Sequence, residues 1–207
     1  MPKSQFAPSR FHLIFATFAL LAALLVAGTA YYIANQPRGP ISIGTALVGG
    51  PFSLTDQTGR KVTDKDFLGK YMLVFFGYTY CPDICPTELQ VMSAALDNLG
   101  AKADDIQPIF ISVDQQRDTP EVLKQYVTNF HPRLVGLTGS AEEIASVARA
   151  YRVYFSKVEN NSGPDAYLMD HSTIMYLMDG QGKFVKHFTY STDAAALARA
   201  IEEAIFP

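Results

Sequence analysis

The chain has 207 residues, 48 per cent of them hydrophobic, and carries a formal net charge of −3. This length and composition allow one domain of ordinary size with a packed core, plus an additional segment. Lysine and arginine do not gather into any basic block. Because binding to a phosphate backbone requires clustered positive charge, nucleic acid is excluded as an expected partner.

Residues 11–33 form an apolar run without Asp, Glu, Lys or Arg. About 20 apolar residues in a helix span the roughly 30 Å hydrocarbon core of a bilayer. Tyr31 and Tyr32 lie at the end of the run, where aromatic rings favour the interface. Basic but no acidic residues precede it. The positive-inside rule therefore predicts a cytoplasmic N-terminus at 1–10, a single transmembrane anchor at 11–33 and export of the remaining chain.

The alternative to a retained anchor is a cleaved signal peptide, because the small residues at 28–30 resemble a cleavage site. The apolar run is longer than a signal-peptide core, which favours the anchor. No Arg- and Ser-rich transit peptide precedes the run, so we expect a single-pass protein of the bacterial inner (cytoplasmic) membrane with its C-terminal domain in the periplasm. Residues 34–48 begin with a Pro- and Gly-rich stretch and are interpreted as a linker to a domain at 49–207.

The exported domain alternates between strands and helices. A hairpin is expected where the short apolar segments 51–54 and 61–63 flank a turn sequence. Apolar runs predict strands at 71–76, 108–113, 134–137 and 172–178, the last of them paired with 183–189. Helical spacing of apolar residues predicts helices at 87–99, 119–130, 141–151 and 192–205, with Thr119 as an N-cap and Pro120 in a first turn. This order predicts a mixed α/β sheet flanked by helices on both faces, as in a thioredoxin-like fold.

The two cysteines, Cys81 and Cys85, stand between a predicted buried strand and a predicted helix. A disulfide closing so small a loop adds little stability, so the pair indicates redox or metal chemistry. The free N–H groups and the dipole of a helix N-terminus stabilise thiolates. The Cys-x-x-x-Cys spacing permits a disulfide and leaves room for an ion, while a pair without function is the alternative. Since Pro86 disfavours helical geometry at Cys85, the helix is expected to begin after it.

Two further residues are candidate ligands. Asp83 lies between the cysteines and is either a weak oxygen ligand or a solvated turn residue. His171 stands at the start of the predicted strand 172–178, which in a thioredoxin-like sheet lies beside the strand that leads to the cysteines. Soft thiolates select Cu(I) and imidazole suits copper, although a structural role for this histidine is the alternative. The other histidines are expected to serve no ligand role. His12 lies in the anchor, His131 is expected to cap a helix end, and His187 lies on a hairpin strand.

Three sequence blocks resemble the SCO/SenC family of copper-binding proteins, which help to assemble cytochrome c oxidase. These blocks are 77–86 with its CPDICP core, Asp114 with RDTPE at 117–121, and DHS at 170–172 followed by MYLMD at 175–179. The segment HPRLVGLTG at 131–139 lies between the last two. The resemblance covers the chain from about residue 50 to the end and agrees with a single N-terminal anchor.

The resemblance implies that copper, as Cu(I), Cu(II) or both, is held by Cys81, Cys85 and His171. It implies a metallochaperone whose partner is the cytochrome c oxidase subunit carrying the dinuclear copper site. Another periplasmic copper chaperone is a second candidate partner. The block at 114–120 carries no obvious ligand and is interpreted as a structural loop with a capped helix, or as a partner surface.

A second hypothesis is an enzyme, a membrane-tethered thiol-disulfide oxidoreductase in which Cys81 and Cys85 form the redox-active pair and reduce the cysteines of the oxidase copper site. Two features favour copper binding. The cysteines are separated by three residues instead of two. Thioredoxin-like oxidoreductases usually carry a cis proline opposite the cysteine pair. No proline occurs here between Asp165 and Phe206, and His171 stands in that region instead. A peroxidase is not favoured, because no peroxide-binding pattern is recognisable.

Overall fold

The structure, a computed structural model, describes residues 10–34, 47–159 and 167–206. The chain divides into two units, with the boundary between Thr45 and Ala46. The first unit contains the helix α1 (Arg10–Ala34).

Within the described part of the chain, we find no helix whose length and hydropathy suffice to cross a membrane. The anchor expected at 11–33 is therefore not confirmed and stays a prediction. Nearly all of the N-terminal segment 1–10 and of the linker 34–48 lies outside the described residues.

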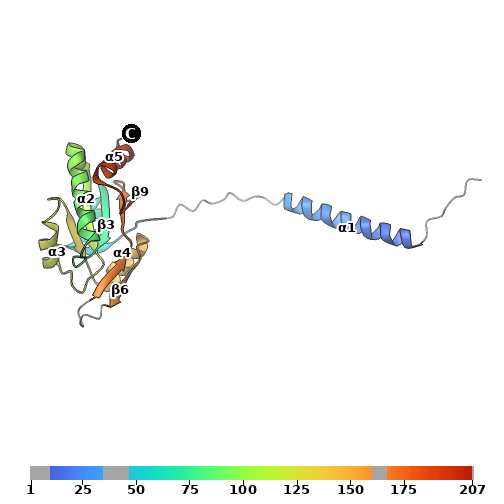
Figure 1. The fold of residues 1–207 in the computed structure, drawn as a ribbon, viewed down its shortest axis with the longest axis horizontal. Helices are drawn as coiled ribbons and strands as arrows, with labels where there is room; N and C mark the ends of the chain where they lie inside the picture. Colours follow the sequence, from blue (N-terminus) through green and yellow to red (C-terminus); the bar gives the residue numbers. More distant parts are fainter. Residues whose placement is uncertain (1–9, 35–46, 160–166, 207) are drawn as a thin grey trace, which may run out of the picture. The chain divides into compact units, whose positions relative to one another are not determined.

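The second unit is built on a seven-stranded mixed sheet (Figure 1). Its strands are β1 (Ser53–Asp56), β2 (Lys61–Thr63), β3 (Tyr71–Gly77), β4 (Ile106–Ser112), β5 (Val135–Thr138), β8 (Ile174–Met178) and β9 (Phe184–Thr189). Their spatial order is β2-β1-β5-β4-β3-β8-β9. The central strands β3, β4 and β5 run parallel. Strand β1 pairs antiparallel with β5, and β8 pairs antiparallel with β3. The edge strands β2 and β9 pair antiparallel with β1 and β8. The predicted hairpins and the mixed sheet are confirmed.

Strand β3 lies in the interior of this sheet, between β4 and β8, because its sequence suits burial on both faces. Its continuous run of apolar residues is buried from Met72 to Gly77, as is typical of strands covered on both sides. Val74 lies opposite Ile109 of the parallel strand β4 and opposite Tyr176 of the antiparallel strand β8. Pairing with β8 extends to Phe75 and pairing with β4 to Gly77, so β4 holds the carboxyl end of β3, from which the cysteine segment continues.

Helices cover both faces of the sheet, as the sequence predicted. They are α2 (Ile84–Leu99), α3 (Pro120–Val127), α4 (Ala141–Ala150) and α5 (Ala194–Ile205). Helices α2, α3 and α5 share one apolar core with Leu73 and Phe75 of β3. Helix α4 packs in a second core with Val74 and Phe76 of the same strand. Successive residues of β3 therefore contribute to opposite cores, in accordance with the alternation of side chains along a strand.

The helix starts agree with their capping residues. The Thr119 hydroxyl accepts a hydrogen bond from the Val122 N–H at 3.4 Å, and Pro120 occupies the first helical position. The Ser140 hydroxyl accepts one from the Glu143 N–H at 3.2 Å. Both side chains satisfy backbone donors that have no partner within their helix. The predicted cap at Thr119 is thus confirmed.

A second, two-stranded sheet was not predicted. It consists of β6 (Phe155–Glu159) and β7 (Tyr167–His171), which pair antiparallel and form no ladder with the main sheet. The sequence of this hairpin lacks a long apolar run, so neither strand was recognised. His171 ends β7, and β8 begins only at Ile174. The expectation that one strand runs from 172 with His171 at its start is therefore wrong.

We expect Leu197→Ala to lower the free energy of unfolding by about 2–5 kcal/mol, because Leu197 is fully buried between α5 and the sheet and its truncation leaves a cavity. Urea unfolding followed by circular dichroism measures the loss. The matched control is Leu47→Ala, because Leu47 is 79 per cent exposed and its truncation should change stability by less than about 0.5 kcal/mol. Equal losses in the two variants would contradict the assigned core.

Candidate metal centre

The cysteine segment leaves the carboxyl end of β3 and enters α2. Helix α2 begins at Ile84, so Cys85 lies in its first turn, and the expectation that the helix begins after Cys85 is wrong. Pro86 is tolerated because the first N–H groups of a helix have no partner within it. Cys85 is fully buried, whereas Cys81, which precedes the helix, is partly exposed.

The fold brings the three predicted ligands together. The Cys81 sulfur accepts a hydrogen bond from the Cys85 backbone N–H at 3.3 Å. The Cys85 sulfur lies 3.4 Å from Nε2 of His171. The two sulfurs and one ring nitrogen of His171 lie within 4.8 Å of one another. Among the described residues, these three alone form such a cluster of ligating side chains.

The His171 ring is oriented by its surroundings. Its Nδ1 lies 3.1 Å from the carbonyl oxygen of Ser172. Since a carbonyl only accepts, Nδ1 carries the proton in this contact, and the lone pair of Nε2 is directed toward the cysteines. Tyr78 and Phe75 pack edge-on against the ring, with centroid distances of 5.8 and 6.3 Å. The imidazole is therefore presented in the form that binds metal ions.

The pKa values of the two thiols are shifted in opposite directions. The hydrogen bond that the Cys85 thiol donates lowers the pKa of Cys81 to about 3, against the effect of burial. The same hydrogen bond, in which Cys85 is the donor, together with burial raises the pKa of Cys85. At neutral pH, Cys81 is thus the thiolate and Cys85 the thiol.

Gly77 permits the close approach of β3 to the buried cysteine. A Cβ atom at this position would lie 2.9 Å from the sulfur of Cys85 and 2.9 Å from a ring carbon of Phe110. Any other residue would therefore displace the thiol or the aromatic core. The sequence placed Gly77 only at the start of the block 77–86, because its neighbours in space are set by the fold.

Asp118 holds the cysteine loop from the opposite side. Its buried carboxylate accepts hydrogen bonds from the Thr79 N–H at 2.9 Å, the Thr79 hydroxyl at 2.6 Å and the Ser112 hydroxyl at 2.6 Å. Burial raises the pKa of Asp118, although these hydrogen bonds favour the ionised form. The structural interpretation of the block 114–120 is thus confirmed at this residue.

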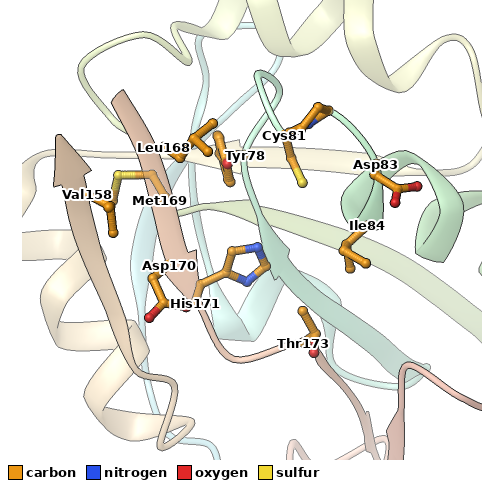
Figure 2. Close-up of a pocket in the computed structure, with 11 residues that line it drawn as sticks. Tyr78, Cys81, Asp83, Ile84, Val158, Leu168, Met169, Asp170, His171 and Thr173 are labelled. Atoms are coloured by element: carbon orange, nitrogen blue, oxygen red, sulfur yellow. The ribbon is translucent and has the colours of Figure 1, made fainter. Parts of the chain in front are cut away.

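A cavity of about 340 Å³ opens beside the cluster (Figure 2). Cys81 and His171 line it, together with apolar side chains from the cysteine loop and from the β6–β7 hairpin (Tyr78, Ile84, Val158 and Leu168). The carboxylate of Asp83 points away from both Cys81 and His171 in Figure 2 and does not belong to the ligand cluster. This placement favours the solvated turn residue over the oxygen ligand.

The other described histidine side chains lie elsewhere. Nδ1 of His131 accepts a hydrogen bond from the Arg133 N–H at 3.2 Å, beyond the end of α3 at Val127, so His131 does not cap that helix as expected. His187 is exposed on β9, as predicted, with its ring 6.2 Å from that of Phe184. Neither residue belongs to the cluster.

The fold and the cluster define a thioredoxin-like α/β domain with a soft Cys-Cys-His site. A family model described as SCO1/SenC matches residues 42–205. The mitochondrial "Protein SCO1 homolog 1" of Arabidopsis thaliana is 43 per cent identical to this chain. The alignment covers 94 per cent of this chain and 60 per cent of that protein. The chain belongs to the SCO1/SenC family.

Solved structures of this family have the same fold. ScoI of Arabidopsis thaliana with copper bound is 47 per cent identical, with a TM-score of 0.73 over 76 per cent of this chain and 98 per cent of that one. ScoI of Bradyrhizobium japonicum with copper bound is 47 per cent identical, with a TM-score of 0.70 over 76 and 99 per cent of the two chains.

We expect iodoacetamide to alkylate Cys81 at a rate that hardly changes between pH 5 and 8, because a thiol with a pKa of about 3 is already ionised throughout this range. The rate is measured by mass spectrometry of the alkylated peptide. In Cys85→Ala, which removes the thiol donor and keeps the backbone N–H, the pKa of Cys81 should rise and the rate should climb with pH across this range. The same steep climb in the wild-type protein would contradict the thiolate assignment.

Proposed function

We propose that the domain at 49–207 binds one copper ion through Cys81, Cys85 and His171 and serves as a metallochaperone for the copper site of cytochrome c oxidase. The observation that carries this proposal is the convergence of the two sulfurs and the imidazole within 4.8 Å. Thiolates are soft ligands that select Cu(I), and imidazole suits copper in both oxidation states. The copper-bound ScoI structures of two relatives support the same choice of metal.

The protonation states of the site suit the capture of a metal ion. Cys81 already offers a thiolate, and Nε2 of His171 offers a lone pair. Cys85 must lose its proton when it coordinates, because the thiolate is the form that binds. The cavity beside Cys81 and His171 gives ligands of a second protein access to the ion. Transfer by exchange of ligands needs no substrate pocket beyond this opening.

The partner that we propose is the oxidase subunit that carries the dinuclear copper site, with another periplasmic copper chaperone as a second partner. This assignment rests on membership of the SCO1/SenC family. The chain spans 60 per cent of the length of the Arabidopsis relative, so the partners of the whole relative come to this chain only as a proposal.

A thiol-disulfide oxidoreductase is the second candidate function. The observation that favours it is the unequal cysteine pair, in which the Cys81 thiolate could attack a disulfide and Cys85 could resolve the mixed disulfide. Oxidation of the pair to a disulfide would prevent copper binding through both sulfurs. A molecule with the disulfide formed therefore cannot hold copper through both sulfurs at the same time.

An anaerobic titration of the reduced protein with copper, followed by optical and EPR spectra, tests the proposal. We expect one tight equivalent with thiolate-to-copper charge transfer. His171→Ala should weaken binding about 100-fold or more, since it removes a ligand, whereas loss of a residue that hydrogen-bonds a ligand typically costs about 10- to 100-fold. The controls His131→Ala and His187→Ala should bind as the wild type does.

Two outcomes would contradict this assignment. Equal losses in all three histidine variants would remove His171 from the ligand set. Absence of tight binding, together with rapid exchange with a model disulfide, would favour the oxidoreductase.

We further propose that 11–33 anchors the chain in the inner membrane, with 1–10 in the cytoplasm, 34–48 as a linker and the copper-binding domain in the periplasm. The uncharged apolar run and the basic residues that precede it support this topology. Alkaline phosphatase fused after Ile33 should be active and β-galactosidase inactive. The reverse pattern would place the domain in the cytoplasm.

A further inference from the structure

His171 lies at the end of a hairpin that packs against the main sheet without joining its hydrogen-bonded ladder. The β6–β7 hairpin forms its own two-stranded sheet. Along β7, Tyr167 is buried and Met169 and His171 are partly buried, whereas Leu168 and Asp170 are exposed. Because alternate residues of a strand share one face, Tyr167 and His171 both point toward the body of the domain. The hold on Tyr167 therefore affects the placement of His171, four residues further along the strand.

Tyr167 is held by the loop between β4 and α3, chiefly by Asp114 and Arg117, while its hydroxyl also lies 3.4 Å from Oε1 of Gln116. Its hydroxyl donates a hydrogen bond to Oδ1 of Asp114 at 2.7 Å. Its carbonyl oxygen accepts one from Nη1 of Arg117 at 3.0 Å. Nε of Arg117 donates to Oδ2 of Asp114 at 2.5 Å, which closes the set of three residues. The guanidinium also lies 3.6 Å from the centroid of the Tyr167 ring.

These contacts lie where hydrogen bonds matter most. Asp114 is 2 per cent exposed and Tyr167 is 7 per cent exposed. If the Tyr167 hydroxyl is removed, the buried Oδ1 of Asp114 stays desolvated without its hydrogen-bond donor, which destabilises the folded state more than loss of a surface hydrogen bond would. Arg117 supplies a planar fork of donors and stacks on an aromatic ring, and a lysine could not replace both functions.

The same loop also holds the cysteine segment. The guanidinium of Arg117 lies 4.6 Å from the centroid of the Tyr80 ring, one residue before Cys81. The neighbouring Asp118 binds the backbone and the hydroxyl of Thr79. One loop thus contacts both segments that carry the ligand cluster. The block 114–120, which has no ligand of its own, joins the two halves of the site.

We propose that Asp114, Arg117 and Tyr167 form a clamp that positions His171 against Cys81 and Cys85. This inference rests on the proposed copper function. A clamped hairpin keeps the imidazole at a high effective concentration near the sulfurs, and a loosened hairpin lowers it. Two thiolates suffice for the soft Cu(I) ion, whereas Cu(II) gains more from imidazole. Loosening the clamp should therefore weaken Cu(II) binding selectively.

The test compares Tyr167→Phe with Tyr154→Phe in the full chain. Tyr167→Phe removes only the hydroxyl that reaches Asp114. Tyr154 belongs to the same hairpin region, but it is 59 per cent exposed and its hydroxyl donates to Ser156 without reaching the loop. We expect Tyr167→Phe to weaken Cu(II) binding about tenfold or more and to change Cu(I) binding less than about threefold. Tyr154→Phe should change neither affinity.

A measurement on the metal-free protein provides an independent readout. Amide hydrogen exchange in β7 should quicken in Tyr167→Phe and stay unchanged in Tyr154→Phe, since local opening of the hairpin is what the clamp opposes. Arg117→Lys, which keeps the charge but loses the forked geometry, serves as the second variant if Tyr167→Phe fails to fold.

The inference is overturned if Cu(I) and Cu(II) affinities fall equally, or if β7 exchange and Cu(II) affinity stay at wild-type values in the variants. His171→Ala, measured in the same series, separates this failure from that of the proposed function. If His171→Ala loses Cu(II) and the clamp variants do not, only the clamp is wrong. If His171→Ala binds both ions as the wild type does, the copper site itself is wrong.

Discussion

The packing of β3 between β4 and β8 is the constraint on which the site depends. Both faces of β3 are buried, β8 pairs with it as far as Phe75, and β4 pairs with it as far as Gly77, so its carboxyl end is held in the sheet. The Val113 N–H reaches the carbonyl oxygen of Gly77 at 2.8 Å and extends this hold to the last residue of the strand. Cys85 then lies directly against that strand, at a distance that only a glycine permits. The ligand-bearing loop therefore has a rigid base.

The elements of the main sheet could be predicted because each carries its own signal. Long apolar runs marked β3 and β4, a capping residue marked α3, and helical spacing of apolar residues marked α4. The β6–β7 hairpin could not be predicted in the same way. Much of its surface faces solvent, and its contacts to the rest of the domain include those of Tyr167 with Asp114 and Arg117, some 50 positions away in sequence. Contacts of this kind leave no periodic pattern.

In the candidate site too, features marked by neighbouring residues in the sequence could be predicted, and features that depend on contacts between distant residues could not. The spacing of Cys81 and Cys85 at a strand-to-helix turn indicated metal or redox chemistry from local sequence alone. His171 became a strong candidate only through the family resemblance, because 86 positions separate it from Cys85. Gly77 and Asp118 were missed as parts of the site. Their importance lies in a close approach and in three buried hydrogen bonds, which exist only in the folded chain.

The cavity gives the site a direction. It exposes Cys81 and His171 to an incoming molecule, while Cys85 lies behind them against β3. Cys81, Cys85 and His171 would hold the ion, and the cavity would leave it open to a ligand of another protein on the side of Cys81 and His171. These two ligands would then be the first that an incoming group could replace, whereas Cys85, which is fully buried, would be the last. The burial of a single thiol would thus keep the ion tethered until the recipient has bound it.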